Sequence, residues 1–552
     1  MKRDFWIVFL IVAAVSCAGI GSYCLLDVDE PRFATASRTM FEGGDWIVPH
    51  FNGDERFDKP ILVYWFQLAS IWLFGVTEFA VRLPSALAVA LASAIVCSIA
   101  QTFACSRRCA VLAGLALGTC AQAQIMAHAA TADALLLATT TCVAYAQFAR
   151  WSGRRTPFTF LLLWGGLAAA ILTKGPPAVV APMSLALGLA LGERSRVHWR
   201  SAALGISVCL ALVALWAVPA YVRTDGRFLE VGLGKHVVER SLRPFEGHGG
   251  FAPWWYLFYV VSVPLTFLPW SGWLPDIVAA LRRRESVAAT PAKGAVGERA
   301  FPNRALTIWL VGTVLVFTIV TSKLPHYPLP AFPALALALG SAAHHGFRYP
   351  RVAAGVFVVC GAVLAAAMVF VLIRFPMGWN ATSVVALGAS ALVGFFLAAK
   401  HSWKGDDSKA ISLVLATSIV VWIILPRGVL AGMSGHWLHI EKARYALPDI
   451  VRDRPLLLYR IVMPSLAWYL GRNYTQLELD DSRRAIEGLL VPGTRVLLRA
   501  SRLDDLKRAI GETDLEPAQR ARIDALLETP LWRNRGILAQ KGKLEDLLVL
   551  GD

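Results

Sequence analysis

The residues best suited to chemistry in this sequence lie in one charged stretch, residues 27–60, between two apolar segments. Asp29 and Glu30 stand immediately before one proline, and Asp58 and Lys59 stand immediately before another. A carboxylate can orient or deprotonate a nucleophile, and an ammonium group can hold an anion such as a phosphate. The stretch therefore predicts an active centre in which carboxylates act beside cations.

Two short helices are expected to position this centre. Proline is favoured in the first turn of a helix and acidic groups beside its positive end, so residues 32–41 are predicted to be helical. Gly43 and Gly44 then end that helix. The apolar run 61–75 predicts a second helix of about fifteen residues, too short to cross a bilayer upright and expected to lie along the interface.

The composition is that of a polytopic α-helical membrane protein. The chain has 552 residues, of which 56% are hydrophobic and 17% charged, and its mean hydropathy is +0.54. The charged residues separate apolar runs of spanning length. The first run, residues 5–26, lacks a small-residue cleavage site, so it is predicted to be a retained helix and not a signal peptide.

The net charge of +16 does not indicate a nucleic-acid-binding protein, because the lysines and arginines lie mainly in short loops between the apolar runs. This distribution follows the positive-inside rule, and it also suits contact with the anionic head groups of membrane lipids. The nine cysteines form no disulfide framework and no zinc-finger spacing, so we assign them no catalytic role.

The distribution of basic loops predicts the topology. Residues 1–430 are predicted to be a transmembrane domain of about thirteen helices, with a cytoplasmic N-terminus because Lys2 and Arg3 precede the first span. Residues 27–82 and 222–253 are then long loops on the outside of the membrane. An odd number of spans also places the C-terminus outside.

The last part of the chain, residues 436–552, has a different composition. It is highly charged, and short β-type runs such as PLLLYRI, TRVLLRA and DLLVL alternate with helical patterns such as SRLDDLKRAI. Alternation of this kind predicts a small α/β domain with its own core, which the predicted topology places outside the membrane.

The unusual polar residues collect in the outside loops. Loops that converge on one face of a helical bundle can build a single pocket, in which cations hold a lipid phosphate, the membrane side holds its tail, and a carboxylate acts on the nucleophile. The candidates are Asp27, Asp29, Glu30, Arg32, Asp58, Lys59, Asp133, Lys174, Arg240, Arg243, His248, Lys323, His326 and Tyr327.

Each candidate also has a purely structural alternative. Asp29 can cap the first short helix, and Asp133 can cap the fourth span. Arg32, one helical turn from Asp29, can pair locally instead of contacting phosphate or tuning that carboxylate. Lys59 and Lys174 can anchor helix ends at the interface. The others can be loop charges, helix-dipole partners or interfacial anchors: Asp27, Glu30, Arg240, Arg243, His248, Lys323, His326 and Tyr327.

Three motifs in order resemble one family. The run DVDEPRFATASRTMFEGGDWIVPH with FDKPILVYW resembles the opening of the lipid A aminoarabinose transferases and their relatives among the polyprenyl-phosphate-dependent GT-C glycosyltransferases, which include protein O-mannosyltransferases. The segments LTKGP, at 172–176, and SKLPHYPLPAFP, at 322–333, match as well. With the predicted spans and C-terminal domain, the resemblance covers the whole chain.

The resemblance implies transfer of a sugar from undecaprenyl phosphate at the periplasmic face of the bacterial inner membrane. The family's first acidic residue falls on Asp29, and its two lysines fall on Lys59 and Lys174. The family has Glu where this chain has Asp58, which keeps the charge and shortens its reach. No cofactor is required; a divalent metal on Asp58 and His248 is an alternative, although one histidine and one carboxylate make a poor zinc site.

The resulting hypothesis is an inverting transfer of 4-amino-4-deoxy-L-arabinose to a lipid A phosphate. Asp29 orients or deprotonates the acceptor phosphate, and Asp133 is a second catalytic candidate. Lys59, Lys174 and Arg32 hold the leaving donor phosphate. The further candidates for substrate binding are Asp58, Arg240, Arg243, Lys323, His326 and Tyr327.

Three rival functions remain open at this point. A transferase of the same fold that acts on a protein hydroxyl or on another glycolipid needs a true general base. A lipid-linked sugar transporter needs polar residues near the middle of the membrane, whereas these spans are nearly free of charge. A lipid-binding scaffold needs the cations and has no use for Asp29.

Overall fold

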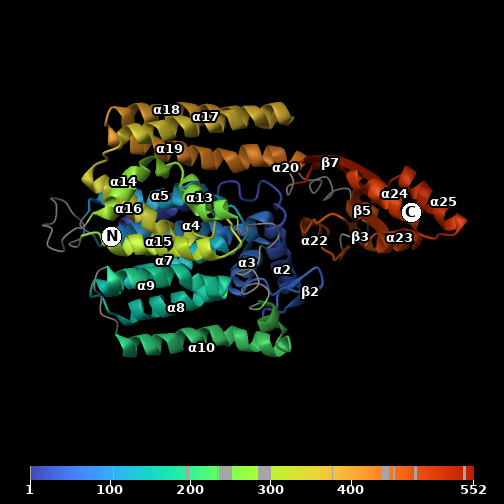
Figure 1. Cartoon of the computed structure of the whole chain (residues 1–552), viewed down its shortest axis with the longest axis horizontal. Helices are drawn as coiled ribbons and strands as arrows, with labels where there is room; N and C mark the ends of the chain where they lie inside the picture. Colours follow the sequence, from blue (N-terminus) through green and yellow to red (C-terminus); the bar gives the residue numbers. More distant parts are fainter. Residues whose placement is uncertain are drawn as a thin grey trace.

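The computed structural model describes residues 2–103, 105–192, 198–232, 234, 252–283, 300–375, 377–437, 447–451, 454–477, 481–538 and 543–552. Most of the chain up to residue 437 is a helical bundle, and the residues beyond it form a sheet with helices at one end of the bundle (Figure 1). The N-terminus lies at the opposite end of the bundle from that sheet.

The membrane-type helices follow from the long apolar runs. Among the described residues, six helices are long and apolar enough to cross a bilayer, and up to eight if each of two bent helix pairs counts as one span. The chain is thus a multi-pass membrane protein, and the predicted total of about thirteen spans remains a prediction. The six are α4 (Glu78–Ala100), α8 (Pro157–Lys174), α10 (Trp199–Arg223), α17 (Pro350–Arg374), α18 (Ala381–Trp403) and the continuous segment Asp407–Ser434. This last segment begins with α19 (Asp407–Ile424) and continues through the π-helix η7 (Leu425–Leu430).

Two predicted spans differ from straight transmembrane helices. The helix of the first span, α1 (Lys2–Ser16), ends ten residues before the apolar run does. The span predicted over residues 254–275 is bent by 111° between Pro253–Thr266 and Trp270–Arg282. Prolines at 264 and 269 explain the bend, because proline cannot donate the backbone hydrogen bond that continues a helix. A third span is the bent pair α5 (Arg107–Thr119) and α6 (Ala121–Ala127).

Small residues bring the innermost helices close together. A Cβ atom on Gly118 would lie 2.5 Å from the Val12 side chain and 2.7 Å from the Ser93 hydroxyl, so α1, α4 and α5 pack at a distance that only glycine permits there. Close approach of this kind replaces the hydrophobic effect as the source of helix association in lipid. The bundle core therefore forms a rigid base beneath the first outside loop.

The first outside loop contains the two predicted short helices. α2 (Asp29–Gly43) begins three residues earlier than predicted and ends at Gly44, whose φ of +73° is the left-handed conformation that favours glycine. α3 (Leu62–Phe74) matches its predicted run. The strands β1 (His50–Phe51) and β2 (Asp54–Glu55) pair between them. A Ser37–Gln67 hydrogen bond of 2.6 Å joins the two helices.

In the described residues, the C-terminal sheet has five strands in the order β4-β3-β5-β7-β6. The three β-type runs named from the sequence are the strands β3 (Leu456–Tyr459), β5 (Arg495–Arg499) and β7 (Lys543–Leu550). The other two strands are β4 (Thr475–Gln476) and β6 (Trp532–Leu538). β3 pairs in parallel with β4 and β5, whereas β7 pairs antiparallel with β5 and β6. The helices α23 (Ser482–Leu490), α24 (Leu503–Glu512) and α25 (Pro517–Glu528) pack beside the sheet.

The C-terminal region touches the first outside loop through α22 (Ser465–Leu470), which packs on α2. The Asp27 carboxylate accepts hydrogen bonds from the Ser465 backbone N–H at 2.9 Å and from its hydroxyl at 2.6 Å. Asn52 exchanges two hydrogen bonds of 2.8 Å with the backbone of Tyr474. The loop that holds the predicted centre is thus held between the bundle and the C-terminal region.

Candidate active site

A polar cavity of about 560 Å³ opens where the outside loops converge. It is formed by the start of α2, the turn between α6 and α7 (Asp133–Trp151), the end of α8, the segment before η5 (Leu329–Ala331), and η7. Ten of the fourteen candidate residues line it: Asp27, Asp29, Glu30, Arg32, Asp58, Lys59, Asp133, Lys174, His326 and Tyr327. These residues come from five distant parts of the chain, and the fold brings them to one place.

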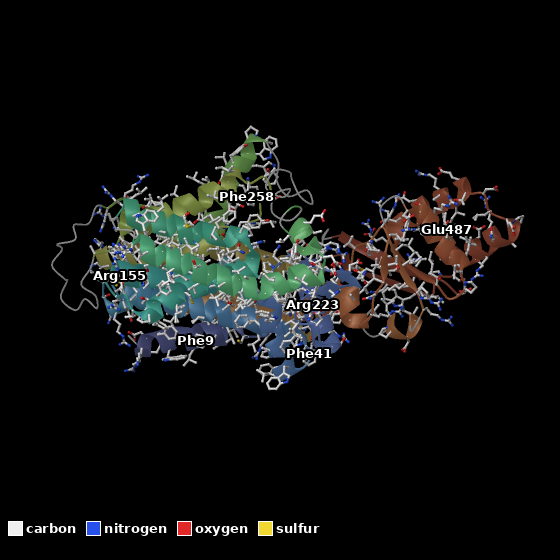
Figure 2. All side chains as sticks on the ribbon, turned by 90° about the horizontal axis from the view of Figure 1, so that it is seen from below. Phe9, Phe41, Arg155, Arg223, Phe258 and Glu487 are labelled. Atoms are coloured by element: carbon white, nitrogen blue, oxygen red, sulfur yellow. The ribbon has the colours of Figure 1, made fainter. Side chains whose placement is uncertain are left out.

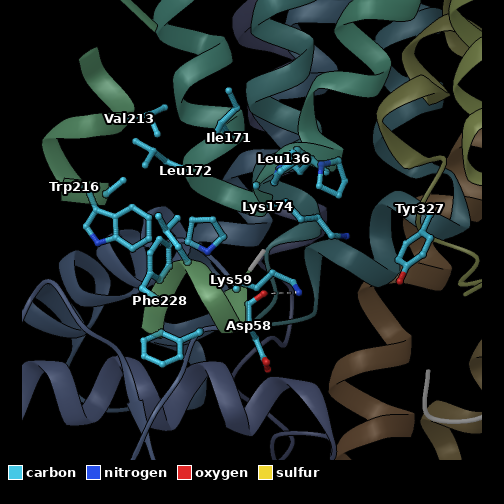
Figure 3. Close-up of a pocket in the computed structure, with 18 of the residues that line it drawn as sticks. Asp58, Lys59, Leu136, Ile171, Leu172, Lys174, Val213, Trp216, Phe228 and Tyr327 are labelled. Atoms are coloured by element: carbon cyan, nitrogen blue, oxygen red, sulfur yellow. Dashed lines mark hydrogen bonds between the residues drawn. The ribbon is translucent and has the colours of Figure 1, made fainter. Parts of the chain in front are cut away.

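A second, apolar cavity of about 290 Å³ adjoins the first. Its apolar lining includes Leu136, Ile171, Leu172, Val213, Trp216, Phe228 and Phe317. Asp58, Lys59, Lys174 and Tyr327 line both cavities. In Figure 3 the ammonium groups of Lys59 and Lys174 point toward a common space, with Val213, Trp216 and Phe228 on the other side. The two lysines therefore stand at the junction between an apolar groove and a polar chamber.

Asp133 and Lys174 form an ion pair in the wall of the chamber. Lys174 is the last residue of α8 and Asp133 the first residue of α7, whose N-cap is Ala132. The capping alternative for Asp133 is therefore wrong, because its carboxylate is directed to the lysine. The pair holds the Lys174 ammonium over the Tyr327 ring, 5.3 Å from the ring centroid.

The charge state of this wall follows from burial and pairing. Burial tends to raise the pKa of Asp133, but His326 and Lys174 outweigh it and hold the pKa at about 2. His326 Nε2 lies 3.7 Å from the Asp133 carboxylate, and burial lowers the pKa of His326 below its ordinary value. His326 is then neutral at pH 7, where Lys174 is the cation beside the ionised Asp133. The imidazole adds its positive charge only at lower pH, where it is protonated.

Asp29 and Arg32 reach the chamber from the first turn of α2. Asp29 is exposed, and among the described residues neither side chain has a hydrogen bond or an ion pair. The N-cap of α2 is Val28, with no side-chain cap, so the capping alternative for Asp29 is wrong. An unpaired carboxylate one turn from an unpaired guanidinium is available to substrate.

Asp58 and Lys59 leave β2 and enter the chamber before α3. The Asp58 carboxylate lies 3.0 Å from Nη1 of Arg56, and Lys59 Nζ donates to the Asp58 carbonyl at 2.9 Å. Sequence reasoning does not single out Arg56, although it lies two residues before Asp58 in the same charged stretch. Its side chain is only 8% exposed and lines the polar cavity.

Two acidic residues near Asp29 serve the framework. Glu30, predicted as a helix-dipole partner, makes a buried ion pair with Arg82 at 2.8 Å. Asp27, predicted as a loop charge, is instead bonded to Ser465 in the C-terminal region. Burial raises the pKa of Asp27 to about 6, against the lowering effect of the Ser465 hydrogen bonds and Arg32.

Lys323 lines neither cavity, although Ser322 lines the apolar groove and Leu324 lines the polar chamber. Its ammonium group donates to the backbone carbonyls of Thr318, at 2.8 Å, and Val320, so it closes the end of α15 (Asn303–Ile319). Its predicted contact with substrate is not supported by this position. Arg240, Arg243 and His248 lie outside the described residues.

The metal hypothesis finds no support in the described part of the chain. There, no group of three or more histidine, cysteine, aspartate or glutamate residues is placed to hold an ion. The Asp58 carboxylate is engaged by the Arg56 guanidinium, so a metal at Asp58 would have to displace that pair. We therefore derive no catalytic step through a metal.

Comparison with known proteins supports the motif-based resemblance. Residues 58–218 match the family model described as dolichyl-phosphate-mannose-protein mannosyltransferase. The chain is 29% identical over 521 residues to the undecaprenyl phosphate-alpha-4-amino-4-deoxy-L-arabinose arabinosyl transferase of Aeromonas salmonicida, covering 90% of this chain and 89% of that protein. The enzyme of the same name from Pseudomonas aeruginosa is 28% identical, covering 89% and 88%.

The fold comparison covers the full length. The crystal structure of ArnT from Cupriavidus metallidurans bound to undecaprenyl phosphate superimposes with a TM-score of 0.72 at 20% identity, over 100% of this chain and 98% of that one. The likeness extends beyond the matched family model to both ends of the chain. It confirms the predicted GT-C fold with several membrane-spanning helices.

Proposed function

We propose that this chain, a glycosyltransferase with the GT-C fold that resembles the aminoarabinose transferases, transfers 4-amino-4-deoxy-L-arabinose from undecaprenyl phosphate to a phosphate of lipid A. The observation that carries the proposal is the junction of the two cavities at Lys59 and Lys174. A polyprenyl phosphate has an apolar chain and an anionic head, and this junction places an apolar groove beside two ammonium groups.

The donor occupies both cavities in this proposal. Its isoprenoid chain lies in the apolar groove along Ile171, Val213 and Trp216, and its phosphate lies between Lys59 and Lys174. The sugar then projects into the polar chamber. Asp133 orients Lys174, and neutral His326 is available there as a hydrogen-bond donor or acceptor to the sugar or the phosphate.

The reaction is a single displacement at the anomeric carbon. An oxygen of the acceptor phosphate forms a bond to that carbon, the bond from the carbon to the donor phosphate oxygen breaks, and its electron pair leaves with the donor phosphate. A doubly ionised acceptor loses one negative charge as it becomes a diester, and undecaprenyl phosphate gains that charge. Lys59 and Lys174 face the place where the new charge develops, which is where cations accelerate the reaction.

Asp29 orients the acceptor. A phosphate monoester at neutral pH is largely ionised, so the attacking oxygen needs position more than deprotonation. Where the acceptor arrives singly ionised, the proton passes from its oxygen to the Asp29 carboxylate. The exposed, unpaired side chain of Asp29 in the chamber suits both roles.

We also propose thirteen spans with the chamber and the C-terminal domain on the periplasmic side of the inner membrane. The polar cavity lies at the end of the bundle that carries the C-terminal sheet (Figure 1). Arg155, from a basic loop, lies at the opposite end from Glu487 of the C-terminal region (Figure 2). Basic loops favour the cytoplasm, so the sheet end faces outward.

The test is mass spectrometry of lipid A from a deletion strain complemented with wild type or with Asp29→Asn. We expect a mass increase equal to aminoarabinose with wild type, and a missing or strongly reduced increase with a stably expressed variant. A full increase with the variant would leave Asp29 without a role in the reaction. No change in lipid A with either protein would overturn the proposed acceptor.

The second candidate function is transfer to a hydroxyl of a protein or of another glycolipid. The match of residues 58–218 to the mannosyltransferase family model favours it, since that region includes Lys59, Asp133 and Lys174. It requires a general base, so Asp29→Asn would then abolish activity and not merely reduce it. Incubation of membranes with labelled donor and protein substrates distinguishes the two.

A further inference from the structure

The four cations of the site fall into two groups according to the cavities that they line. Lys59 and Lys174 line both the apolar groove and the polar chamber, whereas Arg32 and Arg56 line only the chamber. The isoprenoid chain of the donor lies in the apolar groove, so the donor phosphate lies where the groove meets the chamber, beside Lys59 and Lys174. Arg32 and Arg56 line the polar chamber and are not among the lining residues of the apolar groove.

We infer that Arg32 and Arg56 form a second phosphate site, separate from the donor site, which binds the phosphate of the acceptor. The inference rests on the proposed function and extends it by assigning the acceptor contact. It assigns Arg32 to the acceptor phosphate, whereas the sequence alone assigns Arg32 to the donor phosphate. Two anions must meet at one carbon in this reaction, and a pair of cations for each lowers their mutual repulsion.

Arg56 is held ready for such a contact. Its Nε donates to the Tyr64 hydroxyl at 3.0 Å, its Nη1 pairs with Asp58 at 3.0 Å, and its guanidinium lies 5.0 Å from the centre of the Phe33 ring. Nη2 has no partner among the described residues. A guanidinium fixed on two sides loses little further freedom when its third nitrogen binds an oxygen, so binding is favoured.

Arg32 provides the second contact from another direction. It lies one turn into α2, is half-buried, and makes no hydrogen bond or ion pair with the described residues. Asp29 lies one turn before it on the same helix, so an acceptor phosphate held by Arg32 lies within reach of the orienting carboxylate. The positive end of α2 adds to the attraction for an anion.

This arrangement explains a preference for a phosphate acceptor over a hydroxyl acceptor. A phosphate offers several oxygens to two guanidinium groups, and arginine binds phosphate through paired hydrogen bonds. A hydroxyl would leave Arg32 without an anionic partner and would offer Nη2 of Arg56 no charged oxygen. Arg32 and Arg56 are therefore specificity-determining residues.

The experiment uses the purified full-length enzyme in detergent micelles. Initial rates are measured against lipid A concentration for wild type, Arg56→Gln, Arg56→Lys and Arg32→Gln, and the Kd for undecaprenyl phosphate is measured without acceptor. Arg38→Gln is the matched control, because Arg38 lies on α2 outside both cavities and pairs with Glu42. Lys59→Gln is the donor-site comparison.

We expect Arg56→Gln and Arg32→Gln to raise the KM for lipid A by about tenfold or more and to change the Kd for undecaprenyl phosphate less than about twofold. Lys59→Gln should raise the Kd for undecaprenyl phosphate instead. Arg56→Lys keeps the charge beside Asp58 without the planar fork, so its KM should lie between wild type and Arg56→Gln. Retained donor binding also shows that each variant is folded.

A second readout compares lipid A with and without its phosphates. Wild type should favour the phosphorylated acceptor, and both arginine variants should lose most of that preference. An unchanged lipid A KM in both variants, with normal transfer by wild type, would overturn this inference alone. Weaker donor binding in both would place the arginines at the donor phosphate. A wild type that binds donor and transfers to no lipid A would overturn the proposed function as well.

Discussion

Glu30 and Arg82 form a double ion pair in the interior of the protein, with Oε1 to Nε and Oε2 to Nη2 both at 2.8 Å. Arg82 also donates to backbone carbonyls of residues 20, 23 and 24, and Glu30 accepts from the backbone N–H of residues 26 and 130. The pair joins α4 to the segments immediately before Asp29 and Asp133. It therefore positions both catalytic candidates.

Breaking this pair should destabilise the fold. Arg82→Met leaves the Glu30 carboxylate buried without its partner, and we expect a loss of about 3–5 kcal/mol in the free energy of unfolding. Thermal unfolding of the detergent-solubilised protein measures it. Arg223→Met, which breaks the largely exposed pair with Asp45, should cost less than about 1 kcal/mol.

The double variant Glu30→Gln with Arg82→Met separates the ion pair from the backbone contacts. It removes the unpaired charge, so it should be more stable than Arg82→Met alone. Equal stability of the single and double variants would mean that the carbonyl contacts of Arg82 dominate its contribution.

Asp29→Asn should impair turnover without unfolding the protein. We expect kcat to fall by about tenfold to a hundredfold, because the substitution keeps the shape and removes the charge that orients the acceptor. The Kd for undecaprenyl phosphate and the melting temperature should be unchanged, since Asp29 has no hydrogen bond or ion pair among the described residues. A loss above about 10³ would instead indicate general-base catalysis.

Lys174→Met should weaken donor binding. Removal of one of two ammonium groups at the cavity junction should raise the Kd for undecaprenyl phosphate by about tenfold or more. Asp133→Asn should lower stability, because it leaves the largely buried Lys174 ammonium without its carboxylate partner. Equilibrium binding and thermal unfolding separate the two effects.

The contribution of the ionised Asp133 carboxylate to the stability of the fold should not vary with pH near neutrality. A depressed pKa means that the stabilisation is fully present above the unfolded-state pKa of about 3.9 and is lost as pH falls through about 2. The difference in melting temperature between wild type and Asp133→Asn should thus be the same at pH 7 and at pH 8, where the neighbouring His326 is neutral. A difference that shrinks between pH 8 and pH 7 would contradict the assigned ionisation.

The contact between Asp27 and Ser465 should be pH-dependent. The folded-state pKa of about 6 exceeds the ordinary aspartate value, so the folded state binds a proton more tightly than the unfolded chain. The contribution of Asp27 to the free energy of unfolding therefore rises as pH falls from above 6 toward about 4, and it stays constant below pH 4. The melting temperature of wild type should show this rise relative to Asp27→Asn, and parallel curves would contradict it.

Fusions to a reporter active only in the periplasm test the topology. A fusion after Leu550 should be active, because thirteen spans place the C-terminus outside, and a fusion in the basic loop after Trp403 should be inactive. An inactive reporter at Leu550 with a stable fusion protein would require an even number of spans.

Local patterns were sufficient to single out several residues that line the candidate site. Asp29, Asp58 and Lys59 stand out because charge beside proline between apolar runs is unusual, and helix signals predicted α2 and α3 closely. The strands beyond residue 454 followed from alternation. Each of these features depends on neighbours within a few residues, which is the range over which backbone propensity and polarity act.

The tertiary structure decided which charges are free and which are paired. Arg56 with Asp58 is a pair close in sequence, but Glu30 with Arg82, Asp133 with Lys174, and Asp27 with Ser465 join residues far apart in the chain. Long-range pairing depends on how helices pack, which no local pattern contains. The sequence by itself determined that this is a membrane protein with a charged centre outside the membrane. Only the packing of the helices determined that Asp29 and Arg32 line the chamber without a partner among the described residues, whereas Glu30 and Lys323 make structural contacts.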